Sequence, residues 1–209
     1  MSAAPGASAV CSPGRLEAFS DGVFAVALTL LVLELRVPEL YDALSRREAW
    51  EALAALGPKL GSFLLSFAYV AVFWANHHHF FDLVEDVTPG LLWLNNMLLL
   101  CMCFVPFPTA FIGEYPSNPV ALAVFAVVLA GAGLVFTLMW PYAHRRGLLS
   151  ATVTADIVRG IVRRGMLGPP LYAVAGLAAF GAPWMAWAIF TSVPLYFFWH
   201  SMHRPSACD

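Results

Sequence analysis

The residues best placed to do chemistry stand at the start of a long apolar run. Ser20 and Asp21 lie directly before Gly22, and the sequence from Gly22 to Leu33 then contains no charged residue. An ionisable residue beside a membrane-spanning segment is costly unless it is paired or hydrated, so by default it marks a functional or assembly site. Asp21 is therefore the first candidate for a functional residue.

One face of the same run combines small and apolar residues with a single hydroxyl group. Residues three, four and seven positions apart share a face of an ideal helix. That face carries Gly22, Val26, Thr29 and Leu33, with Leu30 at its flank. Asp21 projects about 100° away from it. Two interpretations of Thr29 stay open: its hydroxyl belongs to a functional face, or it only bonds to the backbone of its own helix, as is ordinary for Thr.

Further polar side chains stand at the ends of two later apolar runs. Trp74 and His77 are three positions apart, and Asn95 and Asn96 follow after a short loop. If these ends lie beside Ser20 and Asp21, the indole, imidazole and amide groups reach that pair, and Arg15 can add a charge-assisted bond. An unpaired carboxylate at that depth costs several kcal/mol. We therefore expect a structural network, with a proton relay through Asp21 and His77 as the competing interpretation.

Three consecutive histidines, His77 to His79, suggest a metal site at first sight. Neighbouring residues on a helix diverge by about 100°, so these three side chains cannot converge on one ion. The useful spacing, two histidines at i and i+4 with a third ligand, is absent. The sequence also lacks a Ser/His/Asp grouping, a phosphate-binding glycine loop and paired intramembrane carboxylates. We predict no metal, no cofactor and no enzymatic activity.

The composition indicates the class of protein that must position these residues. Of 209 residues, 60% are hydrophobic and 11% are charged, and the mean hydropathy is +0.74. Soluble domains average about 45–50% apolar and 25% charged residues. The chain is therefore expected to be an all-α integral membrane protein in contact with the lipid bilayer. The net charge of −2 is uninformative about nucleic acid, and no Lys/Arg block suggests such a partner, so none is expected.

The hydrophobic pattern predicts six membrane spans. The expected spans are residues 15–36, 58–81, 90–112 and 118–142, followed by two short spans within 166–199; a re-entrant hairpin is the alternative for the last pair. Residues 39–56 are expected to form an amphipathic helix at the membrane face, and part of the basic segment between residues 144 and 164 an interfacial helix. Residues 15–203 are expected to form one six-helix transmembrane domain, with residues 1–14 and 204–209 as short tails on either side of it.

Basic residues predict the orientation of these spans. With six spans, one side holds Arg15, Arg145, Arg146, Arg159, Arg163, Arg164 and Arg204, and the other holds Arg36, Arg46, Arg47 and Lys59. The side with more basic residues faces the cytoplasm, so both termini are expected there. Glu34 and Glu114 fall at the opposite ends of their spans. They either concentrate cations at a mouth or are ordinary solvated helix ends.

The pattern Arg15-x-x-x-Phe19-Ser20-Asp21-x-x-x-Ala25 resembles the signature of the endolysosomal potassium channel family known as transmembrane protein 175, in its bacterial branch. All five positions match without a gap, and the continuation from Thr29 to Leu35 is also similar to that family. The resemblance implies a six-helix subunit in the inner membrane of a bacterium and a homotetramer in which the first helix lines a central pore.

The resemblance also implies a function. It predicts a channel permeable to potassium ions, with modest selectivity for potassium over sodium. Thr29 would hold potassium transiently, Val26, Leu30 and Leu33 would form apolar constrictions that gate by dewetting, and Gly22 would share their face. The signature residues would hold the pore helix in place. No TVGYG-like loop occurs in the chain. The alternative is a proton-coupled secondary transporter that uses Asp21 and His77.

Overall fold

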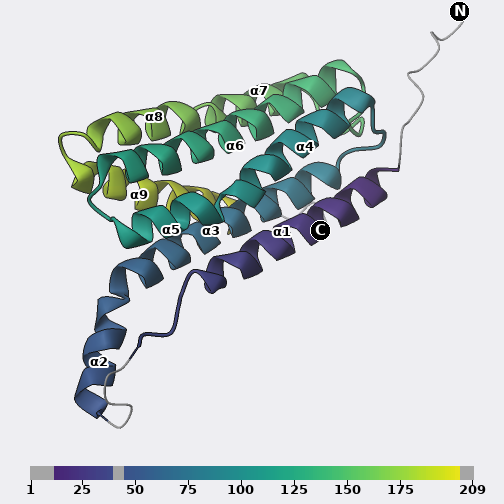
Figure 1. The fold of residues 1–209 in the computed structure, drawn as a ribbon. Helices are drawn as coiled ribbons and strands as arrows, with labels where there is room; N and C mark the ends of the chain where they lie inside the picture. The colour runs from purple at the N-terminus through teal and green to yellow at the C-terminus, as the bar shows by residue number, and fades with distance from the viewer. Residues whose placement is uncertain (1–11, 40–44, 203–209) are drawn as a thin grey trace, which may run out of the picture.

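The structure, a computed structural model, describes residues 12–39 and 45–202 (Figure 1). These residues form nine helices and no strand. The helices are α1 Pro13–Leu33, α2 Arg46–Ala55, α3 Gly57–Phe81, α4 Pro89–Phe104, α5 Pro106–Glu114, α6 Pro119–Arg145, α7 Ala155–Gly165, α8 Gly168–Ala178 and α9 Pro183–Met202. The all-α prediction is confirmed.

Helix α1 begins two residues before the predicted boundary, at Pro13. Proline suits the first helical turn because its fixed φ matches the helix and the N–H that it lacks would have no partner there. Ser12 caps the helix with an extended backbone (φ −69°, ψ 143°) but without a side-chain hydrogen bond. The helix ends at Leu33, three residues before the predicted end, in a turn where Leu35 N–H donates to Val32 O at 3.0 Å.

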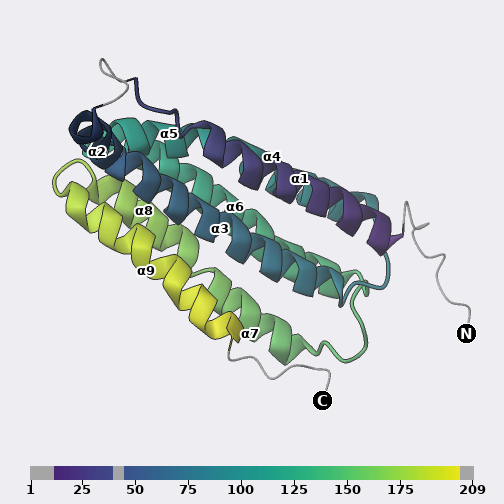
Figure 2. The same ribbon diagram turned by 90° about the horizontal axis from the view of Figure 1, so that it is seen from below.

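Within the described residues, four segments are long and apolar enough to cross a membrane: Pro13–Leu33, Gly57–Phe81, Pro89–Glu114 and Pro119–Arg145. They correspond to the first four predicted spans. The third segment consists of α4 and α5, which meet at Val105. Pro106 lacks a backbone N–H and its ring clashes with the preceding turn, so the regular hydrogen-bond ladder is interrupted there. The four segments run side by side, with α1 packed against α3 and α4 (Figures 1 and 2).

The last part of the chain packs against α6 and α3. Helices α7 and α8 follow one another along α6, and α9 turns back beside α8 (Figures 1 and 2). Helix α8 has 11 residues, about 16 Å of helix, which by itself does not cross a hydrocarbon core of about 30 Å. Val158 of α7 is buried, whereas Arg159, Arg163 and Arg164 are exposed. The total of six membrane spans stays a prediction.

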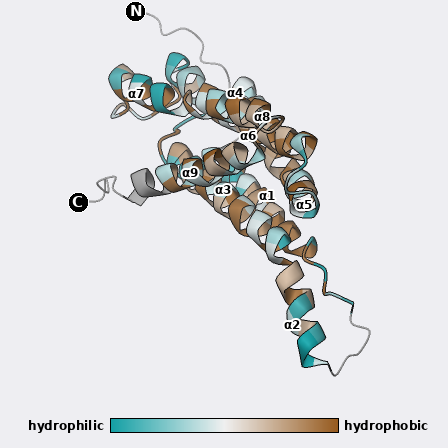
Figure 3. Ribbon diagram, turned by 90° about the vertical axis from the view of Figure 1, so that its left-hand side faces the viewer, coloured by the Kyte–Doolittle hydropathy of each residue, from teal (hydrophilic) through white to brown (hydrophobic). Residues whose placement is uncertain are grey.

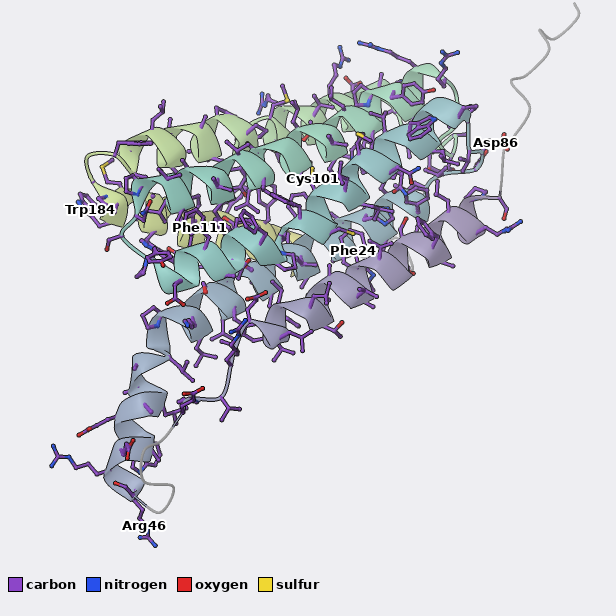
Figure 4. The ribbon with its side chains drawn as sticks, viewed as in Figure 1. Phe24, Arg46, Asp86, Cys101, Phe111 and Trp184 are labelled. Carbon is purple, nitrogen blue, oxygen red and sulfur yellow. The ribbon has the colours of Figure 1, made fainter. Side chains whose placement is uncertain are left out.

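Helix α2 projects away from the bundle at the end opposite to the start of α1, with Arg46 at its far tip (Figures 1 and 4). Ser45 caps it by accepting the Glu48 N–H at 3.3 Å, and none of its residues is buried. Figure 3 shows hydrophilic turns in α2 and α7, whereas the bundle helices are mainly hydrophobic. Helix α2 is thus shorter than the amphipathic helix predicted over residues 39–56. Residues 40–44 of that range lie outside the described residues.

Aromatic contacts tie the helices of the bundle together. The rings of Phe80 and Trp140 meet edge to face at 5.0 Å between centroids, which joins α3 to α6. Phe125 and Phe190 do the same at 5.0 Å between α6 and α9. Tyr69 donates its hydroxyl hydrogen to the Phe190 carbonyl at 2.8 Å. These contacts join α3, α6 and α9 to one another, whereas α1 lies at the edge of the bundle (Figure 2).

Candidate functional site

Helix α1 has two distinct faces in this subunit. One is buried against α3 and α4 and consists of Leu16, Ser20, Phe24, Ala27 and Leu31, spaced four, four, three and four residues apart. The other, which we name the exposed α1 stripe, consists of Gly22, Val26, Thr29, Leu30 and Leu33. The side chains of Val26, Leu30 and Leu33 are 56%, 40% and 69% exposed. An apolar stripe of this size needs lipid or another subunit to cover it.

The Thr29 hydroxyl lies on the exposed α1 stripe and bonds to its own helix. Its Oγ1 donates to the Val26 carbonyl oxygen at 2.9 Å, the intrahelical bond considered from the sequence. Because a hydroxyl has only one hydrogen but two lone pairs, this bond leaves the oxygen able to accept a hydrogen bond or to contact a cation. The two interpretations of Thr29 are therefore compatible.

Three fully buried polar side chains join α1, α3 and α4. Ser20, His77 and Asn95 are each 0% exposed. Ser20 Oγ donates to the Leu16 carbonyl at 2.8 Å, and Asn95 Nδ2 donates to Ser20 Oγ at 2.9 Å. Asn95 Oδ1 lies 2.8 Å from His77 Nε2. Together these bonds form a continuous chain from the α3 imidazole to the α1 backbone.

The direction of every hydrogen bond in this chain can be deduced. Ser20 uses its only hydrogen on the Leu16 carbonyl, so it must accept from the Asn95 amide nitrogen. The amide oxygen of Asn95 then faces His77, and His77 Nε2 must carry a hydrogen to donate to it. Nδ1 of the same ring is buried without a hydrogen-bond partner in the described residues. The arrangement fits a neutral imidazole protonated at Nε2.

Asp21 belongs to a second group of polar contacts between α1 and α3, separate from the Ser20–Asn95–His77 chain. Trp74 Nε1 donates to Asp21 Oδ1 at 3.0 Å, which connects the carboxylate to α3. The Trp74 ring stacks on the ring of His78, with 6.0 Å between centroids and 14° between planes. His78 Nδ1 lies 2.7 Å from Glu17 Oε1, one turn before Asp21 on α1. This group is more exposed than the Ser20–Asn95–His77 chain, and it gives the carboxylate a partner.

Glu17, His78 and the nearby Asp82 are the one group of potential metal ligands among residues 12–39 and 45–202, with ligand atoms within 4.8 Å of one another. His78 already meets the Glu17 carboxylate directly, and Asp82 lies 3.9 Å from its other nitrogen. The group is adequately explained as an ion-pair cluster. The consecutive histidines diverge as expected, because His77 is buried and His78 is exposed.

Some predicted signature residues do not join the network within a subunit. No ion pair or hydrogen bond joins Arg15 to Asp21 in the part of the chain that the structure describes, because six residues turn a helix by about 240° beyond a full turn. Asn96 makes no described hydrogen bond to α1; Asn95, one residue earlier, takes that place. Phe19 is 58% exposed and Ala25 is exposed, so both face outward.

Sequence reasoning missed Glu17, His78 and Phe24. Glu17 lies four residues before Asp21, and His78 lies four residues after Trp74. This i, i+4 spacing places each on the same helix face as a residue already singled out, and it could have found both. Phe24 is 1% exposed and its ring centroid is 5.3 Å from that of His77, so it covers the buried chain of hydrogen bonds; Figure 4 labels Phe24 beside α1. Phe24 lies within an apolar run, so its position in the sequence contained no comparable indication of this contact.

At the opposite end of the bundle, the two carboxylates considered as cation attractors have different surroundings. Glu114 Oε2 lies 2.6 Å from Lys59 Nζ, so its charge is balanced by a neighbour. Glu34 is exposed and lines a cavity with Arg36, Lys59 and Glu114. Basic and acidic groups are therefore mixed at this end, and the carboxylates do not form a purely negative cluster there.

The fold and the polar network together define the class of this protein. Several apolar helices form a multi-pass α-helical membrane protein, and the start of its first helix is fixed by hydrogen bonds from α3 and α4. An α-helix in lipid satisfies its own backbone groups, so side chains alone must specify how the helices meet.

Comparison with known proteins identifies the family. A family model described as "Endosomal/lysosomal potassium channel TMEM175" matches residues 15–106. A potassium channel of Chamaesiphon minutus is 38% identical over 188 residues, which cover 88% of this chain and 92% of the relative. The endosomal/lysosomal proton channel TMEM175 of Homo sapiens is 27% identical over 155 residues, 74% of this chain and 30% of the relative. The chain belongs to the TMEM175 family, which is a family of ion channels and not of enzymes.

A solved structure supports the same assignment. The crystal structure of a lysosomal potassium-selective channel TMEM175 homolog from Chamaesiphon minutus superimposes with a TM-score of 0.77 at 36% identity, over 90% of this chain and 97% of the other. The predicted membership in the bacterial branch of the TMEM175 family is therefore confirmed. The helices described above follow the fold of the Chamaesiphon minutus channel.

Proposed function

We propose that this protein is a potassium-permeable channel with modest selectivity for potassium over sodium. The relative and the solved structure from Chamaesiphon minutus that are similar to it are named as a potassium channel and a potassium-selective channel. The observation that carries the proposal is the exposed α1 stripe, because it places the Thr29 hydroxyl and three large apolar side chains on a face without a neighbour in the described subunit.

The proposed assembly is a homotetramer with four copies of α1 around a central pore. A single α1 cannot enclose a path for ions, and closed cyclic symmetry brings the same face of every copy to the axis. Six membrane spans per subunit, both termini in the cytoplasm and a bacterial inner membrane complete the proposal. The excess of basic residues at the end where α1 begins supports this orientation.

The stripe would form successive layers along the pore. With a rise of 1.5 Å per residue, the Thr29 layer lies about 4.5 Å from the Val26 layer and about 6 Å from the Leu33 layer. Rings of apolar side chains gate by dewetting, so Val26 and Leu33, with Leu30 beside them, would form the constrictions. Four Thr29 oxygens would then hold a potassium ion transiently between them, and Gly22 would leave the pore wide on the Asp21 side.

The signature network would hold α1 at the right angle and depth for this pore. Trp74 Nε1 donates a hydrogen bond to Asp21 Oδ1 at 3.0 Å, and Asn95 Nδ2 donates one to Ser20 Oγ at 2.9 Å. These contacts fix two consecutive residues of α1, on two different faces, directly before Gly22. Rigid support from a second layer of side chains is what positions a functional face accurately. Arg15, Phe19 and Ala25 point away from this support and are proposed to act between subunits.

The alternative function is proton-coupled transport through Asp21 and His77. The human relative is named a proton channel, so a proton pathway through this protein is a second function to test. In the subunit, however, Asp21 bonds to Trp74, whereas His77 bonds to Asn95. An indole N–H only donates and cannot pass a proton onward. No described hydrogen bond joins the two titratable groups, so the geometry favours a structural role.

The test is passive flux of potassium and sodium into liposomes that contain the purified full-length protein. We expect potassium flux to exceed sodium flux. In Thr29→Ala the preference should fall about three- to tenfold, since one neutral polar contact is worth about 0.5–1.5 kcal/mol. Leu33→Ser should raise the flux of both ions, because a polar ring wets the constriction.

A matched control keeps the test specific. Val32 is 49% exposed on the same helix and projects about 100° from Leu33, so Val32→Ser should leave both flux and selectivity nearly unchanged. If Val32→Ser and Leu33→Ser behave alike, the exposed α1 stripe is not the pore wall. Flux that requires a proton gradient would instead support the transporter.

A further inference from the structure

A second cavity lies on the side of α3 that faces away from α1. It is enclosed by α3, α6, α9 and the junction of α7 and α8, and Figure 2 shows α3 between α1 and α9. Aromatic and small residues make up most of its wall, among them Tyr69, Phe73, Gly133, Phe136, Tyr172 and Phe197. This apolar cavity is separate from the exposed α1 stripe, so it is not part of the proposed pore.

The cavity wall changes from polar to apolar along the bundle axis. Asn76 lies five residues before the end of α3, at Phe81, about 7.5 Å from that end. Gly133 lies twelve residues before the end of α6, about 18 Å deep. An amphiphile oriented along the helices would therefore meet polar groups first and an apolar wall beyond them.

Arg164 supplies a positive charge to the cavity. It lines the cavity from α7 and is exposed, and no described ion pair or hydrogen bond engages its guanidinium. By contrast, Arg159 on the same helix is paired with Asp156. The adjacent Gly165 explains the position of Arg164, because an added Cβ there would lie 2.5 Å from Thr137 Oγ1 of α6. Only glycine lets α7 approach α6 this closely.

Trp140 contributes its indole ring to the cavity wall. The residue lines the cavity and is 2% exposed. Its Nε1 is buried and makes no hydrogen bond in the described chain, so this donor is closed to a ligand in the cavity. Trp140 therefore adds apolar ring surface to the wall rather than a polar contact.

We propose that the cavity binds an anionic phospholipid. Its phosphate pairs with the Arg164 guanidinium, and one acyl chain lies along the aromatic wall. Arginine binds phosphate through charge-assisted bonds of fixed geometry, and basic pockets between membrane helices suit anionic headgroups. The unpaired cation distinguishes this occupant from a neutral lipid.

The test is native mass spectrometry of the full-length protein titrated with phosphatidylglycerol or phosphatidylcholine. We expect stoichiometric binding of phosphatidylglycerol and about tenfold weaker binding of phosphatidylcholine, because the choline cation of phosphatidylcholine offsets the charge of its phosphate beside the Arg164 guanidinium. Arg164→Gln should abolish that preference and Arg164→Lys should retain most of it. Arg163→Gln is the matched control, because it removes the same charge from an exposed neighbour that does not line the cavity.

A second variant tests the apolar part of the cavity without a change of charge. A Cβ at Gly133 would meet nothing nearer than Pro169 at 3.8 Å, so Gly133→Ala adds one methyl group at the cavity wall without a clash. It should weaken binding of phosphatidylglycerol severalfold, because one methyl group is worth about 0.8 kcal/mol of apolar contact. Three outcomes would overturn the proposal. Equal losses in Arg163→Gln and Arg164→Gln would indicate diffuse surface charge, unchanged binding in Gly133→Ala would place the acyl chain outside the cavity, and equal competition by free glycerol phosphate would indicate a simple anion site.

Discussion

Replacing Asn95 with Leu would separate the buried chain of hydrogen bonds from the rest of the network. The substitution removes two contacts, to Ser20 Oγ at 2.9 Å and to His77 Nε2 at 2.8 Å. It leaves the His77 N–H without a partner at 0% exposure. Ser20 loses an incoming hydrogen bond but keeps its own bond to Leu16. The damage therefore falls mainly on α3, at the end that supports α1.

The expected loss of stability follows from these groups. One buried donor without a partner costs about 1–3 kcal/mol, and the second lost interhelical bond adds about 0.6 kcal/mol, the average in membrane proteins. The free energy of unfolding should therefore fall by about 1.6–3.6 kcal/mol. For a chain of this length, about 2–4 °C of melting temperature corresponds to each kcal/mol, so Asn95→Leu should melt about 3–14 °C below the wild type.

The assay is thermal unfolding of purified protein in one detergent, followed by tryptophan fluorescence and by size-exclusion chromatography. Asn96→Leu is the matched control, because Asn96 is half-buried and has no described side-chain hydrogen bond; its melting temperature should change by less than about 2 °C. Equal shifts in the two variants would refute the reasoning, since the position of the amide would then not matter.

Two glycines give further predictions. Gly22→Ala should leave both the stability of the subunit and the oligomer unchanged, because nothing lies within 4 Å of an added Cβ and the residue is proposed to face the pore; a loss of oligomer on a calibrated size-exclusion column would contradict that placement. Gly90→Ala should lower the melting temperature by several degrees, because its Cβ would collide with the Tyr142 ring and break the 3.1 Å hydrogen bond between Tyr142 and Thr88; an unchanged melting temperature would refute the steric argument. Tyr142→Phe combined with Gly90→Ala should recover little, since the ring carbon CZ also lies within 2.6 Å of that Cβ.

The first four spans could be predicted from the sequence because each is a local run of apolar residues. The boundaries shifted by a few residues where a proline fixes the backbone, as at Pro13, or interrupts it, as at Pro106. The course of the last third was harder to predict. Gly168–Ala178 is short, and its support comes from lying along α6, a contact that no local pattern reveals.

The candidate site shows the same division. The periodicity of α1 indicated which residues share a face, and the structure leaves that face exposed. The polar residues were also recognisable, because charged and amide groups are rare in apolar runs. Their partners were not recognisable: the sequence pattern did not distinguish Asn95 from Asn96, and it suggested Arg15 as a partner of Asp21. Only the rotation of α4 against α1 selects Asn95, and only the rotation of α3 brings Trp74 to Asp21.

Composition and the helical repeat are enough to assign this chain to a membrane, to locate its long helices and to identify the face of α1 that combines Thr29 with Val26 and Leu33. Both are local properties, which act within one helix. Contacts between helices are different, because they depend on the relative rotation and depth of the helices, and the pattern of a single helix specifies neither. Only the folded subunit therefore reveals that Ser20, Asn95 and His77 form one directed chain, that Glu17 contacts His78, and that Arg164 and Trp140 line a common cavity.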